Sequence, residues 1–569
     1  MNLFRHTFTR RARRLASHEI SPEDVFLDSK NVSNMDMNQM EGHLERPLGR
    51  HVFYLAIGVL FILVGGFTAR LFAMQIMDGK AYAEKADRNH LKTTPIFALR
   101  GTIADRNGTL LAWNTVASST GTSTSEIPER TYTTTPGFSN LLGYVSYPKK
   151  DSSGIFWQEE YIGKDGVEKQ YQTKLQGVPG QRVIAIDAHG EVEAENVTVA
   201  PSHGENIRLT VDAGVQAKLY ERIKALANDY GYVSGAGVIM DVHTGELLAI
   251  VSYPEYDNNL MTNAKTKEEK AQIASDLTDK RQKFLDRAVS GLFTPGSTVK
   301  PFVALAALME HVISPEKQIL STGALVIKNK YGGPDTVFKD WKAHGWTDMR
   351  KALAEWSDEY FYQVGGGYMD QPGLGIDRIN KYATMFGFGT ATGVDLPGEQ
   401  RGTVPSQEWK KKVFGEDWLL GNTYHTAIGQ YGFQLTPLEL ARGVSMLANG
   451  GTLVTPHVLE DLPTTKEVLS IPEKDLNVIR EGMRQGVTQG IGQALAIDGV
   501  HVASKSGTAE LGVKKDLINS WISGFFPYEN PKYAFVVIME KGSVHNTHGA
   551  IFAAREVIEW MRDNTEYTK

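Results

Sequence analysis

The sequence predicts an α+β protein carried on an N-terminal transmembrane helix. Three observations support this prediction: an uncharged apolar stretch at residues 52–69, short strand-like runs separated by turns over residues 79–203, and strand-like runs at residues 236–252 and 520–540. A last helix is expected near residues 551–561. Together these elements indicate an antiparallel sheet flanked by helices, preceded by a β-rich region.

The apolar stretch at residues 52–69 spans about 27 Å at helical rise, which is enough to cross a bilayer. It begins fifty residues into the chain and lacks a clear small-residue cleavage site, so we expect an uncleaved helix at residues 51–77 rather than a signal peptide. The preceding residues 1–50 are polar and are expected to be a disordered cytoplasmic tail. The positive-inside rule then places the rest of the chain outside the cytoplasm. The positive charges on the cytoplasmic side are the arginines that precede the apolar stretch: Arg5, Arg10, Arg11, Arg13, Arg14, Arg46 and Arg50.

Beyond the anchor we expect two domains. Residues 78–204 are predicted to form an elongated, strand-rich domain, called the pedestal below, with strands at 182–186 and 192–199. Residues 205–569 are predicted to form the second domain, which opens with a strand at 207–211.

Length and composition narrow the possible functions. A chain of 569 residues with 41% hydrophobic content is long enough for two or three domains with a large core. The net charge of −6 gives no reason to expect a nucleic-acid partner. The chain contains no cysteine, which excludes a disulfide framework, thiolate catalysis and cysteine-ligated metal.

The most informative motif is Ser297-Thr298-Val299-Lys300, at the predicted start of an apolar helix that ends near His311. Residues three apart lie on one face of a helix, so the hydroxyl and the amine are expected within mutual reach. A serine hydroxyl needs a neighbouring group that accepts its proton before it becomes a good nucleophile. The spacing therefore favours a nucleophile with its own base.

A second motif, Lys505-Ser506-Gly507-Thr508, lies in a predicted strand. A glycine inside a strand often marks close approach of a ligand to the backbone, and the flanking hydroxyls and lysine suit a carboxylate. Together the two motifs indicate an enzyme that forms an acyl-serine intermediate.

A third element, Ser357-Asp358-Glu359, lies between them. A serine that faces Lys300 and Lys505 would relay protons between the nucleophile and a leaving amine. The alternative is that these three residues are an ordinary helix start, which is where Ser, Asp and Glu are favoured. By themselves the residues favour the alternative.

With these motifs the chain resembles the class B penicillin-binding proteins, the monofunctional D,D-transpeptidases of peptidoglycan synthesis, whose motifs are SxxK, SxN and KTG or KSG. The resemblance covers nearly everything from about Leu71 to the C-terminus, and it is most similar to the penicillin-binding protein 2 branch of cell elongation. It is carried further by residues 100–108, 111–114, 142–145, 166–169, 244–246, 293–297, 338–345, 360–363, 386–398, 427–430, 435–438 and 449–451.

The resemblance implies an acyl transfer without a cofactor or a metal. Ser297 would be the nucleophile and Lys300 the base, and the terminal D-Ala would leave after protonation through Ser357, with Lys505 as a further catalytic residue. The backbone N–H groups of Ser297 and Thr508 would form the oxyanion hole. The substrate-binding residues would be Glu359, Ser506, Gly507 and Thr508, with Lys505 helping to hold the terminal carboxylate.

The resemblance also implies the partners and the place of the protein. Its substrates would be peptidoglycan stem peptides or lipid-linked glycan strands, and β-lactams would inhibit it. Its protein partner would be a membrane glycosyltransferase of the shape, elongation, division and sporulation group. The protein would be a single-pass protein of the cytoplasmic membrane, with its penicillin-binding transpeptidase domain outside the cytoplasm.

Two features depart from the family pattern. Glu359 stands where the motif has Asn, and an ionised Glu beside Lys300 would favour the ammonium form, which cannot act as a base. The segment between Asn114 and Leu142 is short, which predicts a pedestal head reduced to a loop. A catalytically weakened scaffold and a division-type transpeptidase stay open as alternatives. The short polar tail argues against a β-lactam sensor, and the uncleaved anchor and large pedestal argue against a β-lactamase.

Overall fold

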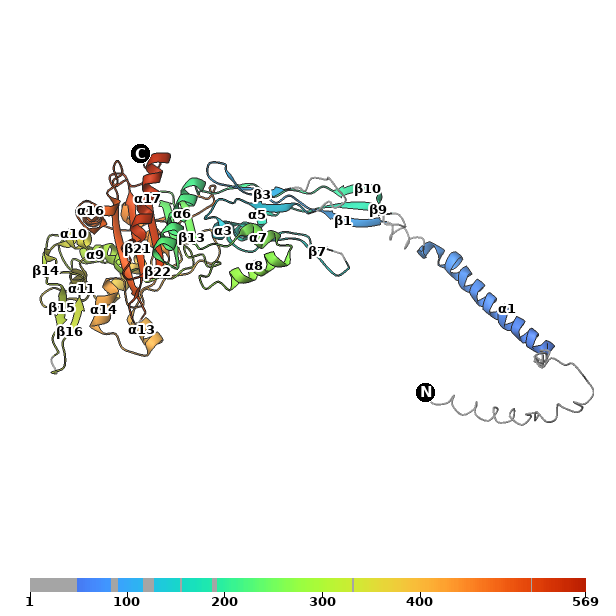
Figure 1. Ribbon diagram of the computed structural model, residues 1–569, viewed down its shortest axis with the longest axis horizontal. Helices are drawn as coiled ribbons and strands as arrows, with labels where there is room; N and C mark the ends of the chain where they lie inside the picture. Colours follow the sequence, from blue (N-terminus) through green and yellow to red (C-terminus); the bar gives the residue numbers. More distant parts are fainter. Residues whose placement is uncertain are drawn as a thin grey trace, which may run out of the picture. The chain divides into compact units, whose positions relative to one another are not determined.

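The computed structural model describes residues 49–82, 91–115, 127–153, 156–186, 192–329, 332–512 and 514–568. The chain divides into two compact units, residues 1–90 and residues 91–569 (Figure 1).

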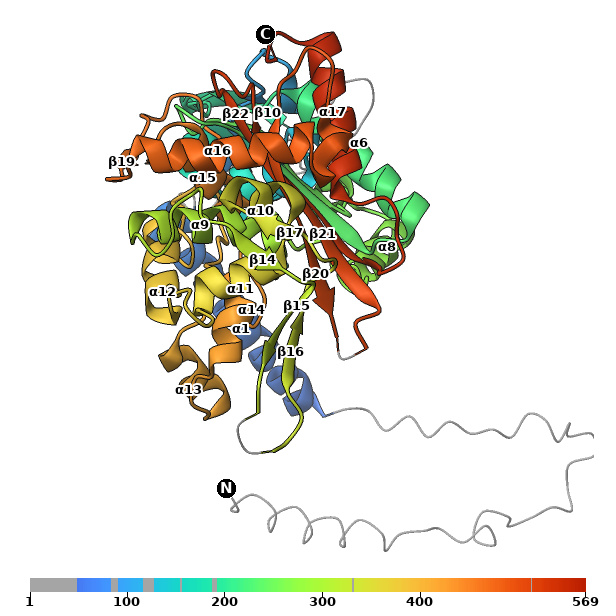
Figure 2. The same cartoon turned by 90° about the vertical axis from the view of Figure 1, so that its left-hand side faces the viewer.

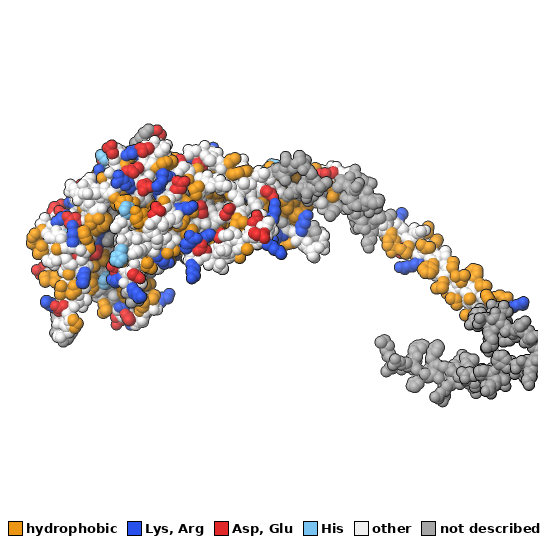
Figure 3. All heavy atoms as spheres, viewed as in Figure 1, with side chains coloured by type: hydrophobic (Ala, Val, Ile, Leu, Met, Phe, Trp, Pro, Cys, Tyr) orange, Lys and Arg blue, Asp and Glu red, His pale blue; other side chains and the backbone are white. Residues whose placement is uncertain are grey.

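The first unit contains the helix expected to cross the membrane. Helix α1 (Arg50–Phe72) continues into a π-helical turn, η4 (Ala73–Met77), and its side chains are almost all exposed. Apolar side chains run along this helix in Figure 3. Among the described residues, a single helix, at residues 50–77, is long enough and apolar enough to span a bilayer. The arginine-rich segment before it, expected to be a disordered tail, lies outside the described residues up to residue 48.

Within its described residues the pedestal contains a three-stranded sheet and a four-stranded sheet, besides the two-stranded pairs β5-β8 and β6-β7. Strands β1 (Leu91–Ile96), β9 (Gly180–Ile186) and β10 (Val192–Val199) form an antiparallel sheet, so both strands predicted near its end are present. The second sheet has the order β11-β2-β3-β4. Residues 116–126, where the reduced head is expected, are not among the described residues. The bounds of the second sheet are β2 (Ile103–Ala104), β3 (Leu110–Thr115), β4 (Glu129–Tyr132) and β11 (Ile207–Arg208).

Strand β11 corrects one expectation about the second domain. Residues 207–211 were expected to open that domain with a strand, but β11 pairs in parallel with β2 of the pedestal and ends at Arg208. Ile103 and Ile207 are both buried where the strands pair. Burying these two isoleucines against each other favours the pairing, which a reading of local sequence does not see.

Inside the pedestal an acidic side chain is held between two arginines. Glu168 Oε2 accepts a hydrogen bond from Arg100 Nε at 2.5 Å, and Oε1 accepts one from Arg130 Nε at 2.8 Å. All three side chains are fully buried. Burial alone would raise the pKa of Glu168, but Arg130 and Arg100 together hold it below its usual value.

We expect Glu168→Gln to destabilise the protein by roughly 3–5 kcal/mol, because it leaves two buried guanidinium groups without their counter-charge. Since the pKa of Glu168 is lowered on folding, its contribution is present at neutral pH and is lost as the pH falls through that lowered pKa. Calorimetry of the full chain in detergent measures the change. Glu205→Gln, at an exposed glutamate, is the matched control, and equal melting temperatures for the two variants would contradict the prediction.

The second domain is organised around a five-stranded antiparallel sheet with the order β13-β12-β22-β21-β20. The strand-like runs predicted at residues 236–252 and 520–540 therefore meet in one sheet (Figure 2). Strand β20 lies at its edge. The strands are β12 (Ser234–Asp241), β13 (Leu247–Tyr253), β20 (Ala503–Leu511), β21 (Leu517–Phe526) and β22 (Tyr533–Ser543).

Each face of this sheet has its own core, because successive side chains point to opposite faces of a strand. On one face, Ile239, Ile522 and Val537 pack with helices α6 (Ala213–Tyr230) and α17 (Ala550–Asn564). On the other face, Val238 and Val536 pack with a larger group that includes α15 (Pro437–Ala448). The helix expected near residues 551–561 is thus confirmed.

The remaining elements of the body are α3 (Ser139–Leu142), β5 (Val145–Ser146), β6 (Lys149–Lys150), β7 (Phe156–Gln158), β8 (Ile162–Gly163), α4 (Gly166–Gln170), α5 (Gln172–Leu175), α7 (Asn258–Asn263), α8 (Lys267–Leu277), η5 (Gly296–Val299), α9 (Lys300–Met309), β14 (Ile319–Ser321), β15 (Ala324–Ile327), β16 (Thr336–Lys339), β17 (Gly345–Thr347), α10 (Met349–Glu355), α11 (Asp358–Gly366), α12 (Ile376–Met385), α13 (Gln407–Phe414), α14 (Leu420–Ala427), β18 (Thr452–Val454), β19 (Lys466–Val468), α16 (Glu473–Thr488) and η6 (Ile491–Leu495).

Candidate active site

Ser297 lies in η5, a 3-10 turn that leads directly into α9. The sequence predicted a helix that starts at this residue, and the structure has a tighter first turn before the α-helix begins at Lys300. Gly296 makes the turn possible. Its φ is +54°, and a Cβ there would lie 2.7 Å from the carbonyl oxygen of Thr508, so only glycine allows η5 to touch β20.

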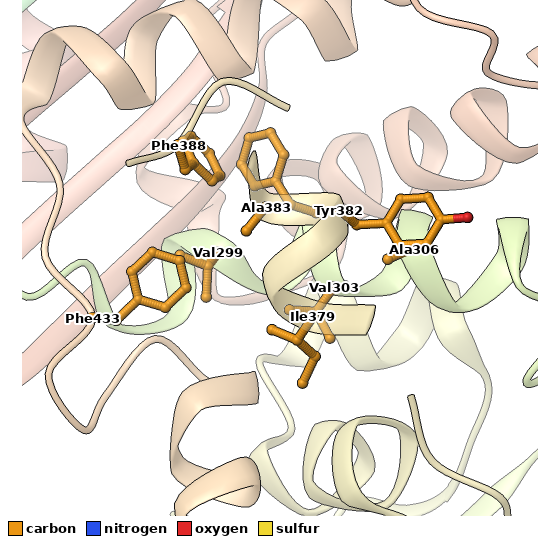
Figure 4. A pocket seen from close by; sticks show the side chains of 9 residues that line it. Val299, Val303, Ala306, Ile379, Tyr382, Ala383, Phe388 and Phe433 are labelled. Atoms are coloured by element: carbon orange, nitrogen blue, oxygen red, sulfur yellow. The ribbon is translucent and has the colours of Figure 1, made fainter. Parts of the chain in front are cut away.

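One face of helix α9 packs against other apolar side chains. Figure 4 shows side chains of α9 facing side chains of α12 together with Phe388 and Phe433. The gap between them has a volume of about 10 Å³, which is about the space of one water molecule, and its lining is apolar. It is a gap in the packing, and the apolar side chains around it hold α9, which begins at Lys300, against α12.

The amine of Lys300 is buried and has two strong partners. Nζ donates to Asp358 Oδ1 at 2.6 Å and to the carbonyl oxygen of Trp356 at 2.9 Å. The side chain of Lys300 is fully buried, and Nζ lies 5.4 Å from the centre of the Phe361 ring. These contacts fix the amine one helical turn from Ser297.

The hydroxyl of Ser357 is turned away from the two lysines. It donates to Asp340 Oδ2 at 2.9 Å and accepts a hydrogen bond from the backbone N–H of Tyr360 at 3.3 Å. Ser357 is therefore the N-cap of α11, which is the helix-start alternative that the sequence left open. The expected placement between Lys300 and Lys505 is not what the structure shows.

Glu359 also differs from its expected placement. Its carboxylate accepts hydrogen bonds from Ser321 Oγ at 3.0 Å and from the backbone N–H groups of Thr322 at 2.8 Å and Gly323 at 2.9 Å. Because successive residues of a helix point about 100° apart, a one-residue step turns the side chain to another side. Asp358, and not Glu359, lies beside Lys300, so the influence of a neighbouring carboxylate on that amine comes from Asp358.

Trp356 is a site residue that the sequence analysis missed. It ends α10 in the left-handed region, with φ 62°, a conformation in which glycine is the usual residue. Its indole ring lies 4.4 Å from Nζ of Lys505, measured to the ring centre. Nothing in the local sequence indicates a left-handed tryptophan, because the conformation depends on how the chain is held on either side.

The second motif lies on the edge strand β20, as predicted. Lys505 is fully buried, and its Nζ donates to the carbonyl oxygen of Ser506 at 2.7 Å. Burial lowers the pKa of Lys505 well below its usual value; Lys300 lowers it further, and Asp358 opposes both. A Cβ on Gly507 would lie 2.7 Å from the carbonyl oxygen of Pro295, so glycine is required where β20 meets η5.

A cleft of about 980 Å³ brings Ser297 together with the second motif, and its volume is that of a typical ligand site. The Ser506 hydroxyl is buried and has no hydrogen-bond partner within the described residues, which marks a place for a polar group of a ligand. Ser297 and Thr508, the expected oxyanion-hole residues, both line the cleft. The other lining residues include Val337, Phe338, Trp341, Trp356, Asp358, Tyr362, His425, Gln430, Tyr431 and Gly507.

In the part of the chain that the structure describes, no group of three or more His, Cys, Asp or Glu side chains is arranged to hold a metal ion. The cleft offers the hydroxyls of Ser297 and Ser506, the carboxylate of Asp358 and a strand edge, and the amines of Lys300 and Lys505 are buried beside these groups. This set suits nucleophilic acyl transfer.

Comparison with known families places two segments of the chain. Residues 235–558 match the family described as the penicillin binding protein transpeptidase domain, and residues 116–209 match the penicillin-binding protein dimerisation domain. The second match covers much of the pedestal.

Individual proteins give the same picture. The chain is 32% identical over 461 residues to the peptidoglycan D,D-transpeptidase MrdA of Haemophilus influenzae, a match that covers 74% of this chain and 67% of that protein. A solved complex of penicillin-binding protein PBP2 and MreC from Helicobacter pylori superposes with a TM-score of 0.68 at 26% identity, covering 83% of this chain and 99% of that one. A structure that describes a peptidoglycan synthase complex coordinating polymerization and crosslinking gives a TM-score of 0.69 at 26% identity, covering 90% and 98%.

Proposed function

Because the chain belongs to the family of penicillin-binding protein transpeptidases, we propose that it is a peptidoglycan D,D-transpeptidase that works through an acyl-enzyme on Ser297. The observation that carries the proposal is the meeting of Ser297 with the Lys505–Thr508 strand in one cleft, with Lys300 buried one turn behind the serine. The Ser297–Lys300 motif and the Lys505–Thr508 strand lie far apart in the sequence, and the fold brings them together.

In the first step, Ser297 Oγ attacks the carbonyl carbon of the penultimate D-Ala of a stem peptide. The Oγ–C bond forms, the C–N bond to the terminal D-Ala breaks, and the hydroxyl proton ends on the departing nitrogen. Lys300 is the proposed first acceptor of that proton. The backbone N–H groups of Ser297 and Thr508 are the proposed oxyanion hole, at about 10² to 10³ in rate per donor.

In the second step, an amine of a neighbouring stem peptide attacks the ester. Its N–C bond forms, the C–Oγ bond breaks, and its proton returns to Oγ of Ser297. The terminal carboxylate of the donor peptide is proposed to lie against Ser506 and Thr508, where the unpaired Ser506 hydroxyl is free to donate.

The cellular location and role of the protein are inferred from helix α1 and from the relatives. A single span with a cytoplasmic N-terminus would put the cleft outside the cytoplasm, beside its substrate. The relatives that resemble the chain include one solved with MreC and one in a peptidoglycan synthase complex. We therefore infer a role in cell elongation, next to a membrane glycosyltransferase of the shape, elongation, division and sporulation group, with β-lactams as inhibitors.

The proposal is tested by the covalent adduct. The full-length protein in detergent is treated with a fluorescent penicillin and digested, and the adduct is mapped by mass spectrometry. We expect one adduct per chain, on the peptide that contains Ser297. An adduct on another residue, or none at any concentration, would reject the proposal.

A catalytically weakened scaffold is the second candidate, and the hydroxyl of Ser357 favours it, because that group is bonded to Asp340 instead of serving the site. Cross-linking of stem peptides by the purified protein separates the two. A penicillin adduct without cross-linked product, in the presence of the glycosyltransferase partner, would favour the scaffold.

A further inference from the structure

The turn that joins α10 to α11 decides which side chains reach the two lysines. Its outer side is pinned by Asp340, whose Oδ2 accepts from Ser357 Oγ and from the backbone N–H of Glu359, each at 2.9 Å. Its inner side presents Trp356, through a left-handed backbone, and Asp358. The hydroxyl expected between the lysines is therefore outside the site, and an indole is inside it.

The two lysines have different surroundings. Lys300 is bonded to a carboxylate, whereas Lys505 has no ion pair within the described residues and donates only to the carbonyl oxygen of Ser506. The indole of Trp356 covers the amine of Lys505 at 4.4 Å. Removing the ring would open a buried amine to the water of the cleft, since Trp356 lines that cleft.

We propose that Trp356 is a positioning residue for Lys505: its indole shuts water away from the amine, so that Lys505 itself carries the proton that the sequence assigned to a Ser357 relay. The inference rests on the proposed function, because it concerns the proton of the acylation step. An amine kept in its neutral form by a dry environment accepts and returns a proton at neutral pH, which an ordinary lysine does not.

The proton balance of the step is closed. Lys300, which is ion-paired with Asp358, gives one proton to the neutral amine of Lys505 as it takes the proton of Ser297 Oγ, and the resulting Lys505 ammonium gives its proton to the departing nitrogen. For a β-lactam the departing nitrogen is the ring nitrogen, so penicillin reports on the same transfer. Lys505 begins and ends the step uncharged, and no further reactant is needed.

Several elements pack around Lys505, and their charged groups are few. Helix α9 contributes Lys300 and α11 contributes Asp358, and both act on the Lys505 amine. Helix α16 also packs on β20, and its Arg484 is bonded to the carbonyl oxygen of Val502. Strand β21 contributes only the hydroxyl of Ser523, and η6 contributes no charged side chain. Removal from water is therefore the largest influence on the pKa of Lys505, and the ring of Trp356 covers one side of its amine.

The test is the pH profile of penicillin acylation, measured as a second-order rate with the full-length protein in detergent between pH 6 and pH 10. We expect Trp356→Ala to move the midpoint of the rising limb upward by about one unit, which slows acylation about tenfold at neutral pH. The rate at the alkaline plateau is expected to stay within about threefold of wild type. Trp356→Phe keeps an aromatic cover and is expected to keep the wild-type midpoint.

An unshifted midpoint in Trp356→Ala would overturn the proposal, whether the rates were unchanged or uniformly lower, because a merely structural tryptophan would lower the rate at every pH. If the alanine variant does not fold, Trp356→Gln replaces it, because its side chain is longer than that of alanine and brings a polar amide to the amine of Lys505. The same shift of the midpoint is expected. A wild-type protein that is not labelled at all would instead reject the proposed function, so the two failures are distinct.

Discussion

Ser297→Ala is expected to abolish penicillin labelling while leaving the stability of the protein within about 0.5 kcal/mol of wild type. The two halves of this expectation have separate causes. Without Oγ there is no atom to form the ester, so labelling falls to background. Within the described residues, however, the Ser297 hydroxyl has no hydrogen-bond partner, so its removal leaves no buried group unpaired.

Gel fluorescence after treatment with labelled penicillin measures the first half, and thermal unfolding of the full chain measures the second. Ser290→Ala is the matched control, because Ser290 is a serine outside the cleft whose hydroxyl donates to the carbonyl oxygen of Gly398. It is expected to label like wild type. Persistent labelling of Ser297→Ala, or a large loss of its stability, would contradict the placement of this hydroxyl.

Much of the second domain was predictable because its signals are local. Buried strands such as β12, β21 and β22 are rich in apolar and β-branched residues, and turn residues lie near their ends. The two motifs were equally visible. Gly507 marks the close approach of β20 to η5. In the first motif, however, the structure bonds Lys300 Nζ to Asp358 and to the carbonyl oxygen of Trp356, and within the described residues that amine has no hydrogen bond to Ser297 Oγ.

The turn between α10 and α11 was not predictable to the residue. The sequence motif placed Ser357 and Glu359 in the site, and the structure places Trp356 and Asp358 there, one residue earlier. The register depends on Asp340, which lies seventeen residues before Ser357 in the chain and holds the outer side of the turn. It also depends on a left-handed backbone at a tryptophan, for which no residue pattern is a signal.

The prediction that a strand at residues 207–211 opens the second domain was wrong for a related reason. The strand is only two residues long, and it belongs to the pedestal because its partner in parallel pairing, β2, lies about a hundred residues earlier. Whether such a short strand forms depends on the segments that pair with it and bury it, and not on its own residues alone. Turn signals and hydrophobic periodicity therefore place domain boundaries only to within a few residues.

Lys300→Met is expected to slow penicillin acylation of Ser297 by about 10² to 10⁴, the range for a general base. Methionine keeps the apolar stem of the side chain and removes the amine that is bonded to Asp358 and to the carbonyl oxygen of Trp356. Lys410→Met is the matched control, since Lys410 is also a buried lysine, bonded to Asn422 and outside the cleft. Its acylation rate is expected to stay within about threefold of wild type.

Lys300→Arg distinguishes a base from a structural cation at the same position. Arginine keeps the positive charge and the ion pair with Asp358, so the fold of the turn should persist, but a guanidinium does not accept a proton near neutral pH. We therefore expect Lys300→Arg to melt close to wild type and to be acylated as slowly as Lys300→Met. If the arginine variant were acylated at the wild-type rate, charge alone would be what the site requires at residue 300, and the proton of Ser297 would have to be taken directly by Lys505.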